Sequence, residues 1–113
     1  MSMDELSPEI EVESVAKLLA EKADFLLLDV REEFEFATAA INGSQLLPMS
    51  ELQDRVTELD PHRERHVVVH CHHGVRSMQV AQALKQYGFS KVQSMAGGIE
   101  QWSLLVDSSV PRY

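Results

Sequence analysis

One short segment carries the side chains best suited to chemistry, and it reads Cys71-His72-His73-Gly74-Val75-Arg76-Ser77. This cysteine loop follows a strand-like stretch at 66–70, with three valines at its centre, and precedes a stretch with helical spacing. A loop between a buried strand and a helix can turn successive N–H groups inward, and the helix dipole adds partial positive charge. Arg76 adds a permanent cation with planar donors. All of these features favour a thiolate, so we expect Cys71 to be a nucleophile.

Two other interpretations of the loop are open to the same residues. Free cysteines are often buried and structural, but such a cysteine would be expected inside the 67–69 strand run and not after it. The segment 70–73 holds four potential metal ligands, yet adjacent residues of an extended chain point in alternate directions and rarely converge on one ion. We therefore expect no metal and no organic cofactor. Loop histidines are usually solvated, so a catalytic part for His72 and His73 stays open.

The flanking segments predict an α/β domain. Runs of β-branched and aliphatic residues indicate strands, and apolar residues three to four apart indicate helices. We expect strands at 10–12, 25–28, 46–47, 66–70 and 91–94. We expect helices near Ser14, at 32–37, from Ser50 to before Pro61, from Ser77 to Gly88 with Val80, Ala81, Leu84 and Tyr87 on one face, and at 99–104. Residues 1–8 are expected to form a flexible arm, 9–106 the domain, and 107–113 a loop-like tail.

Asp29 and Arg31 follow the 25–28 strand directly. The carboxyl ends of parallel strands lie along one edge of a sheet, and ligands bind there. We therefore expect this pair to lie near the cysteine loop and to support it without reacting. Asp29 is expected to accept hydrogen bonds from the loop, and Arg31 to pair with Glu32, Glu35 or a carbonyl at the sheet end.

Composition excludes several classes of protein. The 113 residues carry a net charge of −8, which argues against a nucleic-acid binder and against docking on anionic membranes. No apolar run approaches the roughly 20 residues of a membrane span, and the first residues lack the apolar core of a signal peptide. A single cysteine makes no internal disulfide, which favours a reducing compartment such as the cytoplasm. Because Arg63, Arg65 and Arg76 outnumber Glu64 within 61–77, we expect a neutral-to-positive pocket at Cys71.

Three motifs in order resemble those of the single-domain rhodanese family. The cysteine loop is similar to that family's C-x-x-G-x-R-S loop, residues 28–32 to its L-D-V-R-E segment, and residues 97–102 to its closing G-G-x-x-x-W. The resemblance implies a single rhodanese-like domain with a five-stranded, mostly parallel sheet flanked by helices on both faces. The chain departs from the family pattern at Ala40 and Asn42, where a histidine and a proline are common.

The resemblance also implies an activity. It makes the chain a sulfurtransferase that moves a sulfane sulfur from thiosulfate or a persulfide donor, through a persulfide on Cys71, to a thiol or cyanide acceptor, including a sulfur-relay protein. The residues implied to bind the donor are His72, His73, Gly74, Val75, Arg76 and Ser77. Alternatives are a non-catalytic carrier or partner-docking module and a cysteine-loop phosphatase or arsenate reductase. The last is disfavoured because those enzymes carry C-x5-R and this chain has C-x4-R.

Overall fold

The structure, a computed structural model, describes residues 6–113, so most of the expected flexible arm (residues 1–5 of 1–8) lies outside the described residues. Five strands form one sheet in the order β1-β5-β4-β2-β3, and every neighbouring pair is parallel. The strands are β1 (Glu9–Ile10), β2 (Phe25–Asp29), β3 (Gln45–Leu46), β4 (His66–His70) and β5 (Lys91–Met95). The expected fold class, a parallel α/β sheet with helices on both faces, is confirmed.

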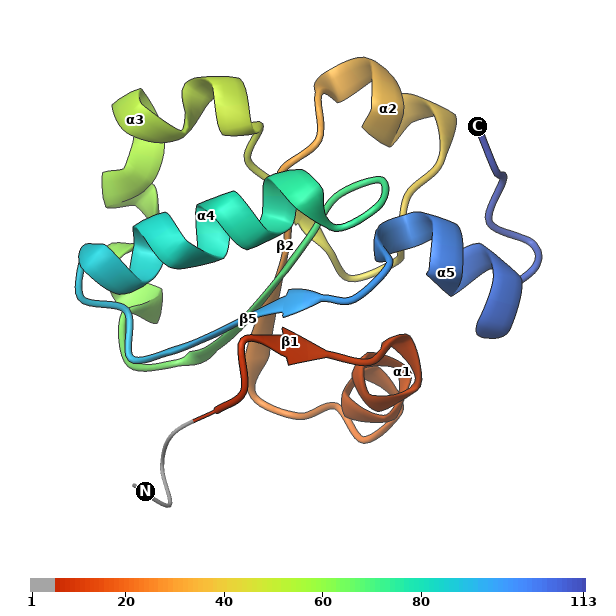
Figure 1. Cartoon of the computed structure of the whole chain (residues 1–113), viewed down its shortest axis with the longest axis horizontal. Coiled ribbons are helices and arrows are strands. Elements are labelled where there is room, and N and C mark those ends of the chain that lie inside the picture. The colour runs from red at the N-terminus through yellow and green to blue at the C-terminus, as the bar shows by residue number, and fades with distance from the viewer. Residues whose placement is uncertain (1–5) are drawn as a thin grey trace.

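Helices cover both faces of the sheet (Figure 1). The α-helices are α1 (Val12–Ala20), α2 (Glu33–Thr38), α3 (Leu52–Arg55), α4 (Val75–Gln86) and α5 (Gly98–Leu105), and 3-10 turns span Met49–Glu51 and Val56–His62. Alternation along the central strands explains the two layers, because neighbouring side chains of a strand point to opposite faces. Leu26 and Leu28 pack in the cluster that holds α3 and α4, while Leu27 packs in the one that holds α1 and α5.

Most element boundaries differ from the sequence prediction by about one residue, and some differences are larger. Val12 begins α1 and does not extend the first strand, and α4 already begins at Val75. Pro61 does not stop its helical segment, because the 3-10 turn Val56–His62 contains it. Tyr87 lies at the end of α4 and is exposed, so it does not share the buried face of that helix. No helix in the described part of the chain is long and apolar enough to cross a membrane.

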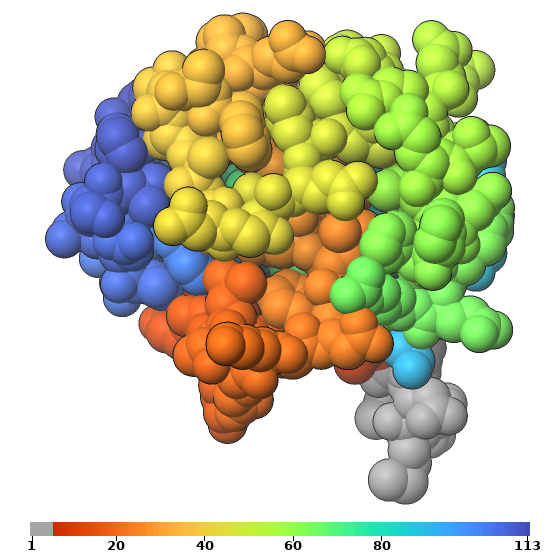
Figure 2. Space-filling view, turned by 180° about the vertical axis from the view of Figure 1, so that it is seen from behind, coloured from red at the N-terminus to blue at the C-terminus, as the bar shows by residue number. Residues whose placement is uncertain are grey.

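The C-terminal segment, residues 107–113, returns toward α2. Ser103 donates a hydrogen bond of 2.9 Å to the carbonyl of Val110, whose side chain is buried. The segment lies beside α2 in both views of the whole molecule (Figures 1 and 2). At the other end of the described chain, Ser94 N–H donates to the carbonyl of Pro8. The division into an arm, a domain and a tail stays a prediction.

Candidate active site

Cys71 lies directly after β4 and is almost fully buried. Its Sγ accepts hydrogen bonds from the N–H groups of Gly74 at 3.1 Å and Ser77 at 3.3 Å. Both groups belong to the start of α4, where the first N–H groups have no partner within the helix. Gly74 adopts a φ of +108°, which turns the chain from the strand into the helix. The sulfur thus occupies the place of a capping group at the N-terminus of a twelve-residue helix.

The Ser77 side chain and the start of α5 both support the cysteine loop. Ser77 Oγ lies 3.4 Å from Cys71 Sγ and 2.7 Å from Ser94 Oγ on β5. The N–H groups of Ile99 and Glu100 donate to the carbonyls of Cys71 and His72 at 2.9 and 3.1 Å. Strand β5, through Ser77, and helix α5 therefore hold the backbone around Cys71 Sγ in place.

Asp29 and Arg31 form a fully buried ion pair, with 2.6 Å between Arg31 Nη2 and Asp29 Oδ2. The Asp29 carboxylate also accepts from the Arg31 backbone N–H at 3.0 Å. The expectation that Asp29 would accept from the cysteine loop was wrong, because Arg31 takes up both carboxylate oxygens. The expected pairing of Arg31 with the carboxylate of Glu32 or Glu35 was also wrong. Its guanidinium pairs with Asp29 and also donates to the backbone carbonyls of Glu35, inside α2, and of Ala39, directly after α2.

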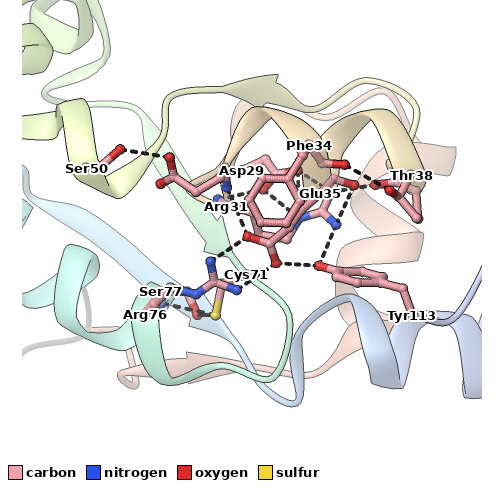
Figure 3. A network of polar contacts seen from close by, with 12 residues as sticks. Asp29, Arg31, Phe34, Glu35, Thr38, Ser50, Cys71, Arg76, Ser77 and Tyr113 are labelled. Carbon is pink, nitrogen blue, oxygen red and sulfur yellow. Dashed lines mark hydrogen bonds and ion pairs between the residues drawn. The ribbon is translucent and has the colours of Figure 1, made fainter.

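Arg76 is paired with Glu35 and is not a free cation. Its Nη1 and Nη2 donate to the two Glu35 carboxylate oxygens at 2.7 and 2.9 Å (Figure 3). The hydrogen bond from Arg76 is the main cause that lowers the pKa of Glu35 to about 2. Glu35 also accepts from the N–H of Glu32, which completes the capping box of α2. The pair therefore ties the start of α4 to α2.

His72 lies between two rings. Its imidazole stacks on His73 at 4.0 Å between centroids and on Tyr113 at 3.9 Å, the latter with the planes 9° apart. Burial lowers the pKa of His72, and the neighbouring His73 lowers it further. Val75 is exposed at the first position of α4. Across residues 6–113, no three His, Cys, Asp or Glu side chains come together as a metal site.

The expected neutral-to-positive pocket at Cys71 was based on three arginines, and two of them lie away from the site. Arg63 and Arg65 precede β4, so they lie at the opposite end of the strand from Cys71. Arg63 pairs with Asp60 and donates to the carbonyl of Tyr87 at the end of α4, while Arg65 pairs with Asp24. Proximity in sequence did not bring these charges to the site.

Two residues that contact the cysteine loop were not predicted to do so: Glu35, which was expected only as a partner of Arg31, and Tyr113. Glu35 is buried while its neighbour Phe34 is 72% exposed, which inverts the order that hydrophobicity predicts. The sequence feature that could have identified Glu35 is its position three residues after Glu32, the N-cap residue of α2. Tyr113 lies in the segment expected to be a loop-like tail, and no local pattern marks its contact with residues 78 and 82 positions away.

Fold and site together define a class of protein: a parallel α/β domain whose single cysteine lies in a strand-to-helix loop, with backbone N–H groups directed at the sulfur. The model of the rhodanese-like domain family matches residues 11–105. The chain therefore belongs to the rhodanese-like family, as its three motifs predicted.

Curated relatives cover most of the chain. A "Sulfurtransferase" of Allochromatium vinosum is 37% identical over 84% of this chain and 87% of its own length. The "Thiosulfate sulfurtransferase GlpE" of Coxiella burnetii is 37% identical over 74% of this chain and 77% of its own. The "Putative sulfur carrier protein YrkF" of Bacillus subtilis is 33% identical over 85% of this chain but only 51% of its own length. Among solved structures, a rhodanese-related protein from Thermoplasma volcanium is 28% identical, with a TM-score of 0.76 over 93% of this chain and 96% of its own.

Proposed function

We propose that this chain is a sulfurtransferase that carries a sulfane sulfur on Cys71. The observation that carries the proposal is the pair of N–H groups, from Gly74 and Ser77, directed at the sulfur of the chain's single cysteine. N–H groups fixed in this way stabilise a thiolate and, after reaction, the terminal sulfur of a persulfide anion. The names of the two 37% identical relatives support the same activity.

Both steps of the proposed sulfur transfer proceed without an external oxidant or reductant. The Cys71 thiolate attacks the outer sulfur of thiosulfate, a new S–S bond forms, and the S–S bond of the donor breaks so that sulfite leaves with the electron pair. A thiol persulfide donor reacts in the same way and releases its thiolate. An acceptor thiolate or cyanide then attacks the terminal sulfur and restores the Cys71 thiolate. No metal or organic cofactor takes part in either step.

The remaining site residues are assigned by their contacts. The loop from His72 to Ser77 is the donor-binding segment, with Gly74 and Ser77 supplying N–H groups. Asp29 and Arg31 support the loop indirectly, through α2 and the pair between Glu35 and Arg76. The physiological acceptor is a thiol, including that of a sulfur-relay protein, and the lone cysteine favours the cytoplasm as the compartment.

Intact-mass measurement tests the proposal. The protein is incubated with thiosulfate or with a cysteine persulfide and weighed before and after cyanide is added. We expect one added sulfur, its loss with cyanide as thiocyanate appears, and no adduct in Cys71→Ser. Absence of an adduct from either donor would rule out the proposed function. Turnover of an aryl phosphate would instead support the phosphatase alternative, and turnover of arsenate the arsenate reductase alternative.

A second candidate is a sulfur carrier that needs a partner protein for turnover. The relative named as a putative sulfur carrier supports it. Both functions predict the adduct, so steady-state turnover separates them. Repeated thiocyanate formation from thiosulfate and cyanide alone would favour the enzyme, whereas a single sulfur per chain without turnover would favour the carrier.

A further inference from the structure

Tyr113, from a distant part of the chain, contacts one end of the cysteine loop directly and is linked to the other end through Glu35. Its ring stacks on His72, which follows Cys71 directly. Its hydroxyl donates to Glu35 Oε2 at 2.8 Å, and this carboxylate holds Arg76 near the loop's other end. The same hydroxyl accepts from Arg31 Nη1 at 2.9 Å, so its donor and one of its acceptor sites are both used (Figure 3).

The segment that carries Tyr113 is anchored on α5 before it reaches the loop. Val110 is buried and bonded to Ser103 through its carbonyl. Arg112 forms an ion pair with Glu100 at 2.6 Å. The Glu100 backbone N–H in turn bonds to the carbonyl of His72. The segment that carries Tyr113 is therefore attached to α5 at two points, and α5 in turn is bonded to the cysteine loop.

We propose that Tyr113 is a positioning residue for the cysteine loop, acting on His72 through its ring and on Arg76 through Glu35. The N–H groups of α5 hold the loop at the carbonyls of Cys71 and His72, whereas Gly74, further along the loop, permits other backbone conformations. Clamping His72 and Arg76 limits the motion of the residues between them. The N–H groups of Gly74 and Ser77 then stay aligned on Sγ, as charge stabilisation in the reaction requires.

Amide hydrogen exchange tests the clamp without reference to sulfur chemistry. We expect the Gly74 and Ser77 amides to exchange at least ~5-fold faster in Tyr113→Ala than in the wild type, while the central-strand amide of Val68 changes by less than ~2-fold. Tyr113→Phe keeps the ring stack and removes only the hydroxyl, so we expect an intermediate effect. The matched control is Tyr87→Phe, at the chain's other tyrosine, which is exposed at the far end of α4.

Loading rates test the route through Glu35, and this part rests on the proposed function. We expect Tyr113→Phe to lower the rate of Cys71 persulfidation at saturating thiosulfate by ~3–10-fold, because hydrogen bonds to charged groups are strong. In a Glu35→Gln background the same change should cost less than ~2-fold, since both substitutions break one connection. Tyr87→Phe should load at the wild-type rate.

The outcomes separate the two proposals. If the Gly74 and Ser77 amides exchange faster in Tyr113→Ala but the wild type forms no sulfur adduct, the positioning role stands and sulfur transfer is rejected. Exchange at these amides equal to that of Tyr87→Phe would overturn the positioning role even where loading proceeds. Equal acceleration at Val68 would also overturn it, since it would mean general destabilisation. Effects of Tyr113→Phe and Glu35→Gln that simply multiply would overturn the route through Glu35.

Discussion

Asp29 and Arg31 have no exposed side-chain surface, and their charges are compensated mainly by each other. Burying an ion is costly, and removing one member of such a pair leaves the other uncompensated. Arg31 also donates to Ala39 and Tyr113, so it joins the end of β2 to α2 and to the C-terminal segment. We therefore expect the pair to stabilise the surroundings of the site.

Asp29→Asn keeps the size of the side chain and removes the charge. We expect it to lower the free energy of unfolding by ~3–5 kcal/mol, because Arg31 stays buried without its counter-ion. Asp24→Asn is the matched control, since it removes an Asp–Arg pair whose aspartate side chain is 85% exposed. Exposed pairs contribute little, so this variant should unfold like the wild type. Urea titration measures both, and equal stabilities of the two variants would contradict the prediction.

At the level of elements, the first residue of α5, Gly98, approaches the cysteine loop more closely than a side chain allows. Gly98 adopts a φ of +62°, and a Cβ placed there would overlap the carbonyl oxygens of Cys71 and His72. These are the carbonyls that accept the N–H groups of Ile99 and Glu100. The glycine is therefore needed both for its backbone conformation and for the contact between α5 and the loop.

Gly98→Ala should therefore cost more than the left-handed conformation alone. Gly43→Ala provides the comparison, because Gly43 has a φ of +90° but its added Cβ would meet only Leu19 Cδ2 at an ordinary 3.6 Å. Left-handed strain at either position costs ~1–2 kcal/mol. We expect Gly98→Ala to lose ~2 kcal/mol more than Gly43→Ala and to load sulfur more slowly, since the loop must shift. Equal losses in chemical denaturation would show that the loop yields without cost.

At the level of the whole molecule, the sequence predicted the features that depend on residues close together along the chain. The continuous apolar runs around Leu27 and Val68 located the central strands, and the position of Cys71 between strand and helix located the loop. The partners of Arg76 and His72 were not predicted, because Glu35 and Tyr113 are 41 residues from them along the chain and the pairing is decided by packing. For the same reason, charge counted along the sequence placed Arg63 and Arg65 at the wrong end of β4.

His70, the last residue of β4, links the fold to pH. Its side chain is fully buried, and among residues 6–113 neither ring nitrogen has a hydrogen-bond partner. The charged groups beside it are Asp29, whose Oδ2 lies 3.8 Å from Nε2, and Arg31. Burial is the main cause that lowers the pKa of His70 from its ordinary 6.5 to about 4. The ring is therefore neutral in the folded protein at pH 7.

The sign of the effect on stability follows from proton uptake. Between pH 6.5 and about 4 the unfolded chain binds a proton at His70 that the folded protein does not, so the free energy of unfolding falls as the pH falls through this window. The slope for one such group is at most ~1.4 kcal/mol per pH unit. Glu35, with its pKa lowered to about 2, adds a similar loss only at lower pH.

His70→Gln should therefore flatten this part of the stability profile. We expect the wild type to lose stability between pH 7 and pH 5, and the variant to lose ~1–2 kcal/mol less over the same interval. The comparison uses the difference between the two pH values, so it holds even where the variant is less stable at both. His73→Gln, which removes an exposed imidazole, is the control. A drop in His70→Gln as large as that in the wild type would mean that His70 takes up its proton equally in the folded and unfolded chains.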